Sequence, residues 1–371
     1  MVRLAARLCD GQHMNKPVIL LGHGVRLAGA DPARLLTLGV PILSSWMAAD
    51  VVDNRHENYF GRPGVYGWRV ANKVLYEADH IIAIGCRMSA WMIGHMGLRP
   101  EQELVMVDCD WEEADRMKAV WINEDIVAFI NSFTIQSSPE WLAQCKEWAE
   151  QYPIIEAIHA DSNGYMNAYR IASYLNTIIR PDEHIVVDTG SLMCPVFQSM
   201  RFTPPQRVYT AGGLGEMGNA MPGAIGISFA RGKKDVLCLM GDGGAMMNIQ
   251  ELATIKQHNL PVKMIVFEND GYSMIKGTFN TVKRERVGVS RASGLGLPEI
   301  HKIAHACGIT SFDITDWKQL QTVMPWWLKA PSPILLNIRI DPEQEFMPRL
   351  KPVNKDGVIT PPRFCDMSPL L

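Results

Sequence analysis

Met240-Gly-Asp-Gly-Gly244 closes one short apolar run, and Glu268-Asn-Asp-Gly271 closes the next one along the chain, Val262 to Phe267. Continuously apolar runs of this length, ended by Gly or Asp, are typical of strands buried in a parallel sheet. A helical pattern from Asn248 to His258 connects the two runs, as a crossover helix would. Two neighbouring strands are therefore expected to end at the same edge of one sheet.

The polar residues at these strand ends are an acid and an amide, Asp242 and Asn269, which lie 27 positions apart. Hard oxygen ligands suit Mg²⁺, which takes the rest of its octahedron from phosphate oxygens and water. Backbone N–H groups of glycines and of a helix N-terminus suit an anionic diphosphate. The arrangement predicts a metal–diphosphate site. The alternative is that the Gly-Asp-Gly-Gly stretch is merely a turn and Asn269 a strand-end cap.

The stretch from Gly241 to Lys263 carries a resemblance to a known family. It consists of Gly-Asp-Gly-Gly-Ala-Met-Met-Asn-Ile-Gln-Glu-Leu-Ala-Thr-Ile-Lys, and later of Asn-Leu-Pro-Val-Lys. In these residues, and in the spacing to Asn269, it resembles the thiamine diphosphate (ThDP) enzymes of the acetolactate synthase and pyruvate decarboxylase superfamily. The resemblance implies that Asp242 and Asn269 bind Mg²⁺ through their side chains and that Gly271 binds it through its carbonyl.

A second glycine-rich block covers residues 211–226, Ala-Gly-Gly-Leu-Gly-Glu-Met-Gly-Asn-Ala-Met-Pro-Gly-Ala-Ile-Gly, and resembles the element that cradles the cofactor in this family. The resemblance gives catalytic roles to Met217, as the apolar wedge that folds ThDP, and to Gly215, whose carbonyl would accept a hydrogen bond from the 4′-amino group. The thiazolium would then serve as electron sink for loss of CO₂ from a 2-oxo acid. The alternative is a glycine-rich loop that caps a helix of small residues, and both can hold.

Together with the loop Asp188-Thr-Gly-Ser191, these blocks define the set of residues expected to contact the cofactor. By the resemblance they are Gly190, Ser191, Gly215, Met217, Gly241, Asp242, Gly243, Gly244, Ala245, Asn269, Gly271, Tyr272, Met274 and Ile275.

The expected substrate pocket departs from the family pattern at two positions. Met274 and Ile275 would form apolar walls above the thiazolium, but Thr278 stands where acetolactate synthases tend to carry Trp. Glu216 stands beside the wedge where the family commonly has Ala or Ser; it could touch substrate or face solvent. These departures put the specific 2-oxo acid in doubt.

Strands and helices alternate along the chain, which predicts an α/β fold of two doubly wound domains with mainly parallel sheets. The expected strands are Pro17 to Gly22, Val40 to Ser44, His80 to Gly85, Leu104 to Asp108, His184 to Asp188, Asp235 to Met240, Val262 to Phe267 and Pro333 to Ile340. Helices are expected at Pro32 to Leu38, Asn72 to Glu77 and Met166 to Ile179. The resemblance implies a central Rossmann-like domain over residues 1–136, a helical linker over 137–163, and a ThDP diphosphate-binding (PP) domain with a C-terminal tail over 164–371.

Two other cofactors find little support in the first domain. Acetolactate synthases bind FAD there through an Arg-Phe-Asp-Asp-Arg element, whereas this chain has Arg87-Met-Ser-Ala-Trp91, so only Arg87 matches and FAD is doubtful. Gly22-His-Gly24 is not a full dinucleotide fingerprint, which disfavours a nicotinamide-dependent oxidoreductase.

The composition describes a soluble globular protein with a large core. Of its 371 residues, 47% are hydrophobic and 20% charged, and the formal net charge is −3, which argues against a nucleic-acid partner. No apolar run is long enough to span a bilayer. Residues 1–8 have too short an apolar core for a signal peptide and are interpreted as a helix fragment. The eight scattered cysteines indicate a reducing, cytoplasmic compartment without disulfides.

In this superfamily a pyrimidine-binding (Pyr) domain supplies the glutamate that drives cofactor tautomerisation, and the chain begins where that domain should already have ended. We therefore expect a ThDP- and Mg²⁺-dependent, acetolactate synthase-like subunit that decarboxylates or ligates a 2-oxo acid such as pyruvate. It would work as a homo- or hetero-oligomer with a Pyr-domain-bearing chain and have very low activity alone. The alternative is a truncated, non-catalytic ThDP-binding or assembly module.

Overall fold

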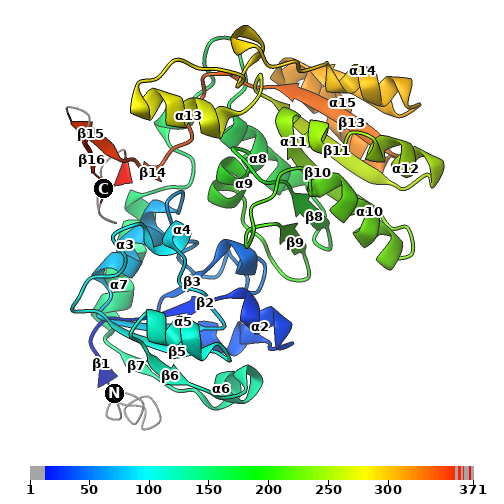
Figure 1. Cartoon of the computed structure of the whole chain (residues 1–371). Coiled ribbons are helices and arrows are strands. Elements are labelled where there is room, and N and C mark those ends of the chain that lie inside the picture. Colours follow the sequence, from blue (N-terminus) through cyan, green and yellow to red (C-terminus); the bar gives the residue numbers. More distant parts are fainter. Residues whose placement is uncertain (1–12, 356–357, 361, 363–366, 369–371) are drawn as a thin grey trace. The chain divides into compact units, whose positions relative to one another are not determined.

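The computed structural model describes residues 13–355, 358–360, 362 and 367–368. Two compact units, each built on a parallel sheet, make up the chain (Figure 1). The first comprises Met1–Ile154, Arg201–Pro204 and Met347–Leu371; the second comprises Ile155–Met200 and Pro205–Phe346. The helix fragment expected at residues 1–8, Cys9 and Cys365 lie outside the described residues. Within the described part of the chain, no helix combines the length and apolar character needed to cross a bilayer.

The first unit contains a five-stranded parallel sheet in the order β3-β2-β4-β5-β6. These strands are β2 (Pro17–Leu21), β3 (Ile42–Ser44), β4 (His80–Ile84), β5 (Glu103–Val107) and β6 (Val120–Ile122). The helical elements are α2 (His23–Leu27), η1 (Pro32–Thr37), η2 (Trp46–Ala48), α3 (Arg69–Glu77), α4 (Ala90–Ile93), α5 (Trp111–Arg116), α6 (Ile126–Ser132) and α7 (Pro139–Gln151). Short pairs complete the unit: β1 (His13–Met14) with β7 (Gln136–Ser137), β14 (Arg349–Leu350) with β17 (Met367–Ser368), and β15 (Val353–Lys355) with β16 (Val358–Thr360).

The Gly22-His-Gly24 turn of this unit is explained by packing of backbone against backbone. A Cβ at Gly22 would lie 2.0 Å from the Gly85 carbonyl oxygen, and a Cβ at Gly24 would lie 2.6 Å from the Gly85 Cα. The Gly24 amide donates to that carbonyl at 2.9 Å. The glycines therefore let the turns after β2 and β4 touch. His23 bonds to the Met47 carbonyl through Nδ1 at 2.9 Å, so its ring has a partner within this unit.

The second unit contains a six-stranded parallel sheet in the order β12-β13-β11-β10-β8-β9. The strands are β8 (His184–Val187), β9 (Arg207–Thr210), β10 (Val236–Gly241), β11 (Val262–Glu268), β12 (Thr310–Ile314) and β13 (Ile334–Arg339). The helical elements are η3 (Ala157–His159), α8 (Ala168–Ile178), α9 (Met193–Ser199), α10 (Ala220–Ala230), α11 (Asp242–Met247), α12 (Glu251–Gln257), α13 (Ser273–Val282), η4 (Arg291–Ser293), α14 (Ile300–Ala306) and α15 (Trp317–Lys329).

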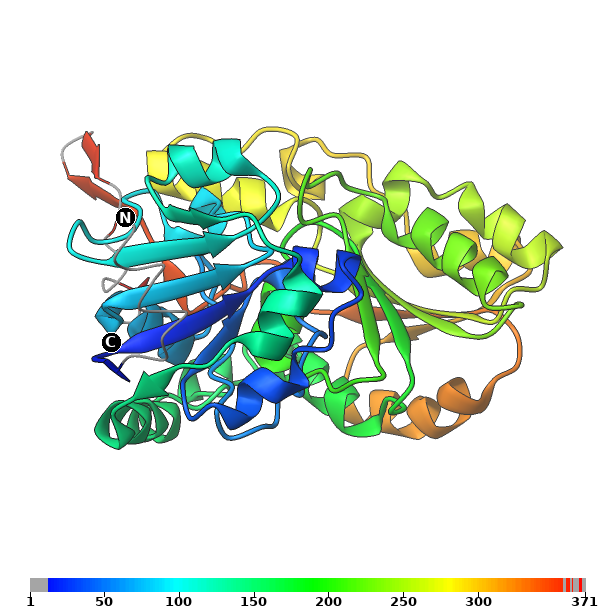
Figure 2. The ribbon, with the colours of Figure 1, turned by 90° about the horizontal axis from the view of Figure 1, so that it is seen from below.

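Helices cover both faces of this sheet. Buried side chains of α10, α12 and α14, among them Ala224, Leu252 and Ala304, share one core cluster with the central strands. Helices α8 and α15 lie next to each other on the opposite face (Figure 2). The ring of Tyr174 in α8 contacts that of Trp317 in α15 edge to face. Two mainly parallel sheets of this kind confirm the predicted α/β doubly wound class.

The strand order places the functional loops at one point of the second sheet. Strand β8 pairs with β9 on one side and with β10 on the other. The connection from β8 leads to one edge of the sheet, and the connection from β10 leads towards the other edge. Open α/β sheets bind ligands outside the carboxyl ends of the strands at such a switch point. Asp188 follows β8, Asp242 follows β10, and Asn269 follows β11.

In the two large parallel sheets, the structure adds three strands that the apolar patterns did not predict, β6, β9 and β12, and each is an edge strand. It also differs in the helices. The expected helix at residues 32–38 is the 3₁₀ segment η1, which begins with a proline. The expected helix at residues 248–258 is found as α12, which begins three residues later, and the structure adds α11, which starts at Asp242 directly after the strand. The helix in the segment 137–163 is α7, whose buried Trp141 donates to the Pro17 carbonyl.

A buried acid at the opposite end of β8 makes stability depend on pH. Burial raises the pKa of Glu183 to about 7, although the Arg180 guanidinium 3.3 Å away favours the ionised form. The folded protein therefore binds more protons than the unfolded chain between about pH 4.5 and 7. Its free energy of unfolding consequently falls as the pH rises through that window.

Glu183→Gln removes this titration. We compare the free energies of unfolding of the variant and the wild type. We expect the variant's value minus the wild type's to increase by about 1–2 kcal/mol when the pH is raised from about 5 to 7.5. Urea denaturation of both proteins at each pH measures it. A difference that stays constant with pH would show that Glu183 does not titrate in this range.

Candidate metal and diphosphate site

Asp242 is a buried carboxylate at the end of β10 that holds two strand-end loops together. Its Oδ1 accepts from the Gly243 amide at 2.7 Å, and its Oδ2 accepts from the amides of Asn269 and Gly271 at 3.2 and 3.0 Å. Burial raises the pKa of Asp242 to about 6, although these backbone hydrogen bonds favour its ionised form. A cation at this carboxylate would relieve the cost of burying the charge.

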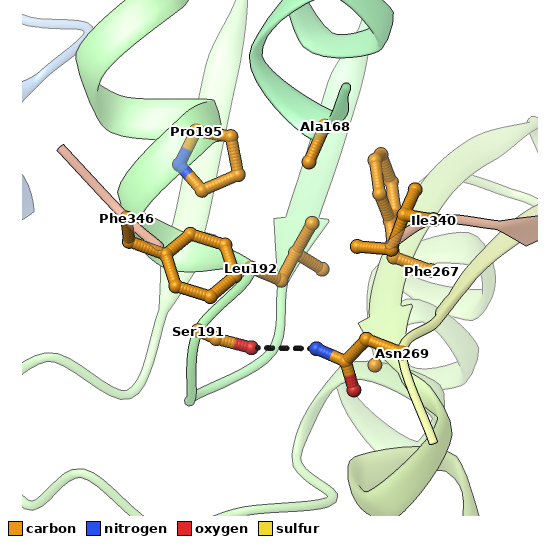
Figure 3. Close-up of a pocket in the computed structure, with 9 residues that line it drawn as sticks. Ala168, Ser191, Leu192, Pro195, Phe267, Asn269, Ile340 and Phe346 are labelled. Carbon is orange, nitrogen blue, oxygen red and sulfur yellow. Dashed lines mark hydrogen bonds between the residues drawn. The ribbon is translucent and has the colours of Figure 1, made fainter. Parts of the chain in front are cut away.

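Asn269 brings a second oxygen to the same point. Its side chain is 3% exposed, and its Nδ2 donates to the Ser191 hydroxyl at 3.2 Å. Its Oδ1 is buried and has no hydrogen-bond partner within the described part of the chain. In Figure 3 this oxygen points away from Ser191, at the rim of a small cavity lined by apolar side chains such as Leu192 and Phe267.

A buried amide oxygen without a donor is costly unless a cation or water satisfies it. The backbone amide of the same residue, Asn269, donates to the buried Asp242 carboxylate, at the ends of the adjacent strands β10 and β11. Among the residues that the structure describes, no cluster of three or more His, Cys, Asp or Glu side chains could hold a metal ion. A set of one carboxylate, one amide and a backbone carbonyl fits Mg²⁺, which keeps few protein ligands and shares the rest with phosphate and water.

Asp188, which follows β8, is a second buried carboxylate and contacts the starts of α10 and α11. Its Oδ1 accepts from the amides of Gly218 and Asn219 at 2.9 and 3.0 Å, at the start of α10. Burial raises the pKa of Asp188 to about 6, opposed by these hydrogen bonds. A Cβ on Gly244 would lie 1.9 Å from Asp188 Oδ2, so only glycine fits there. The glycine-rich start of α11 thus lies directly against the loop after β8.

Residues 212–217 of the second glycine-rich block are exposed. Met217 is 36% exposed, and its Cε would be 3.6 Å from a Cβ at Gly243, where the Tyr272 ring lies closer still. Gly215 is exposed and has φ +79°, a conformation that favours glycine. Glu216 is exposed and accepts from the Asn219 side chain, so it faces solvent in this structure.

The loop after β11 leads into α13, which carries the two expected apolar walls. Met274 and Ile275 are consecutive residues on the first turn of this helix. Met274 is half-buried and Ile275 is 48% exposed. The buried Lys276 ammonium donates to the Asn269 carbonyl at 2.8 Å, and burial lowers the pKa of Lys276. Gly190 follows β8 with φ +124° and precedes Ser191. The structure therefore brings Asp242, Asn269, Gly271 and Ser191 together.

Comparison with known proteins agrees with this geometry. Residues 12–134 match the central domain of the thiamine pyrophosphate enzymes, and residues 188–338 match their C-terminal TPP-binding domain. The chain carries two domains of the thiamine pyrophosphate enzyme family. Thiamine pyrophosphate is another name for ThDP, so the family predicted from the sequence is confirmed. The TPP-binding match spans all the strand-end loops described above.

Individual relatives are acetolactate synthase large subunits. The isozyme 1 large subunit of Escherichia coli K12 is 28% identical over 348 residues, which are 91% of this chain and 60% of the relative. The isozyme 2 large subunit of the same organism is 27% identical over 350 residues, 91% of this chain and 62% of the relative. The large subunit of Porphyra purpurea is 26% identical over 367 residues, with shares of 95% and 61%. The chain thus spans about three fifths of the length of these relatives.

Three residues around these strand-end loops were not predicted from the sequence. Asp188 was recognised only as the start of a phosphate-side loop, yet its position directly after an apolar strand is the signal that it shares with Asp242. Lys276 and Arg291 act on the loop after β11 through backbone and carboxylate contacts. No spacing or motif in the sequence predicts these contacts of Lys276 and Arg291.

Proposed function

We propose that this chain provides the diphosphate and Mg²⁺ half of a ThDP site in an acetolactate synthase-like enzyme that decarboxylates or ligates a 2-oxo acid. The observation that carries the proposal is the unsatisfied Oδ1 of Asn269, a residue whose backbone amide donates to the buried Asp242 carboxylate. The names of the acetolactate synthase relatives support the activity.

In this proposal each loop has a separate task. Asp242 and Asn269 hold Mg²⁺ with their side chains, and Gly271 holds it with its carbonyl. The backbone amides of Gly244 and Ala245, with the loop residues Gly190 and Ser191, face the diphosphate, as do the neighbouring Gly241 and Gly243. Bound ThDP supplies an electron sink for loss of CO₂ from a 2-oxo acid.

The remaining residues orient the organic part of the cofactor and the substrate. Met217 provides an apolar support, and the Gly215 carbonyl accepts a hydrogen bond from the aminopyrimidine. Tyr272, Met274 and Ile275 line the substrate side. Pyruvate is the proposed substrate, and a Pyr domain on a partner chain in a cytoplasmic oligomer completes the site. FAD is not included, because only Arg87 matches the FAD-binding element.

Thermal denaturation tests the proposal on the chain as it exists. We expect the melting temperature to rise by several degrees with ThDP and Mg²⁺ together, because a ligand that binds only the folded state stabilises it. ThDP without a divalent ion, or Mg²⁺ alone, should give a smaller rise in melting temperature. The absence of any rise with the pair would refute the binding site.

Activity is tested separately, with a panel of 2-oxo acids and a Pyr-domain-bearing partner. Release of CO₂ with formation of an acyloin supports the carboligase, and an aldehyde supports the decarboxylase. Binding of ThDP and Mg²⁺ without either product in the presence of the partner would favour the alternative, a non-catalytic ThDP-binding or assembly module.

A further inference from the structure

We propose that Arg291 is the positioning residue of the metal loop, here defined as residues 268–271. Its guanidinium ties this loop to the connecting segment, residues 283–297 between α13 and α14, and so fixes the orientation that Mg²⁺ requires. The inference rests on the proposed function, because it assigns a purpose to the same loop.

The guanidinium of Arg291 reaches three separate acceptors. Its two terminal nitrogens donate at 2.9 Å to Asp270 Oδ1 and at 2.9 Å to Glu268 Oε1. Its Nε donates at 3.0 Å to the Leu297 carbonyl at the end of the connecting segment. A planar fork can satisfy three acceptors in fixed directions, whereas a lysine ammonium is a compact point charge on a flexible stem.

The metal loop has an unusual backbone that these contacts hold. Asp270 has φ +58°, a left-handed conformation that non-glycine residues adopt infrequently. Its Oδ1 also accepts from the Arg291 amide at 3.3 Å. The other carboxylate, Glu268, is anchored to the sheet because its Oε2 accepts from the buried Asn337 side chain of β13 at 2.8 Å. Arg291 therefore fixes the residues on both sides of Asn269.

The connecting segment also packs directly on Gly271, the expected third ligand. The Val289 carbonyl accepts from the Tyr272 amide at 3.0 Å. A Cβ on Gly271 would lie 2.4 Å from that carbonyl oxygen, and Gly271 has φ +108°. The direction of the Gly271 carbonyl thus depends on the position of the segment that Arg291 anchors two residues after Val289.

Such positioning matters for Mg²⁺ more than for a larger cation. Mg²⁺ demands near-ideal octahedral geometry, whereas Ca²⁺ accepts irregular and flexible ligand sets. Residues that orient metal ligands from behind commonly change metal affinity about 10–100-fold when they are replaced. A loop that loses its anchor should therefore lose preference for Mg²⁺ over Ca²⁺.

Arg291→Lys tests the proposal because it keeps the charge and removes the three-way geometry. The matched control is Arg286→Lys, from the same segment, where Arg286 contacts Glu343 and Asn280 but not the metal loop. Amide hydrogen exchange of the protein without ligand is measured first. We expect exchange at residues 269–272 to speed up about tenfold in Arg291→Lys and less than about threefold in the control.

The second measurement is calorimetric titration with ThDP in the presence of Mg²⁺ or Ca²⁺. For Arg291→Lys we expect the apparent Kd to rise about tenfold with Mg²⁺ and less than about threefold with Ca²⁺. An equal loss with both ions would indicate general damage and overturn the positioning role.

The two measurements separate this inference from the proposed function. Unchanged exchange at residues 269–272 in Arg291→Lys overturns the positioning role, whatever the wild type binds. Faster exchange together with a wild type that binds ThDP with neither ion overturns the proposed function, and Arg291 then remains as the anchor of the loop.

Discussion

Asp242→Asn is expected to weaken binding of ThDP and Mg²⁺ at least about 100-fold, which corresponds to about 2.7 kcal/mol. Asp242 is the one carboxylate in the proposed ligand set, and the neutral amide cannot replace its charge. Its two oxygens accept three backbone N–H bonds, so the NH₂ group of an Asn side chain must face at least one of these donors. Isothermal titration of wild type and variant with ThDP in Mg²⁺ measures the effect.

The same variant should remain folded, which separates binding from stability. Losing one or two hydrogen bonds destabilises the variant. Removing a buried charge stabilises it, because burial raises the pKa of Asp242 and so disfavours its ionised form. These effects oppose each other, so we expect the free energy of unfolding without ligand to change by no more than about 1 kcal/mol. The exposed Asp182, at the far end of β8, provides the control, and Asp182→Asn should bind as the wild type does. Retention of wild-type affinity by Asp242→Asn would remove the metal site from the proposal.

Gly244→Ala is expected to destabilise the protein by about 3 kcal/mol, because it forces atoms into an occupied space. The new methyl group would lie 1.9 Å from Asp188 Oδ2, far inside contact distance. Asp188 cannot move away without breaking its bonds to the Gly218 and Asn219 amides. Either α11 shifts or the start of α10 loses its cap. Urea denaturation without ligand measures the loss.

Gly241→Ala is the matched control three residues earlier. Gly241 has φ −85°, and a Cβ there would meet no heavy atom within 4 Å, so its substitution should cost less than about 1 kcal/mol. Equal stability of the two variants would mean that the approach of α11 to Asp188 does not constrain the fold.

The central strands could be predicted because burial on both faces leaves a continuous apolar run. Strand β10 shows this pattern, and β11 shows it apart from the buried Lys263; all residues of both strands except the last are buried. The edge strand β9 consists of Arg-Val-Tyr-Thr and is only half-buried, and β12 contains Ser311 and Asp313. One-sided burial at the edges dilutes the apolar signal, so those strands became visible only in the folded sheet.

The site divides in a similar way. Ser191 and Asn269 were both expected near the diphosphate, but the bond between them and the free Oδ1 depend on side-chain orientation. Met217 and Ile275 have exposed side chains, and the roles that the resemblance gives them stay predictions.

From the sequence alone, the chemistry of the strand ends was determined: parallel strands joined by a crossover must end at one edge, so Asp242 and Asn269 meet. Only the tertiary structure decided how that edge is held. Asp188 supports α11 and α10 from another strand, and Arg291 anchors the metal loop from a segment that follows α13. Contacts of this kind join residues distant in the chain, and they depend on strand register and loop conformation, which local periodicity does not encode.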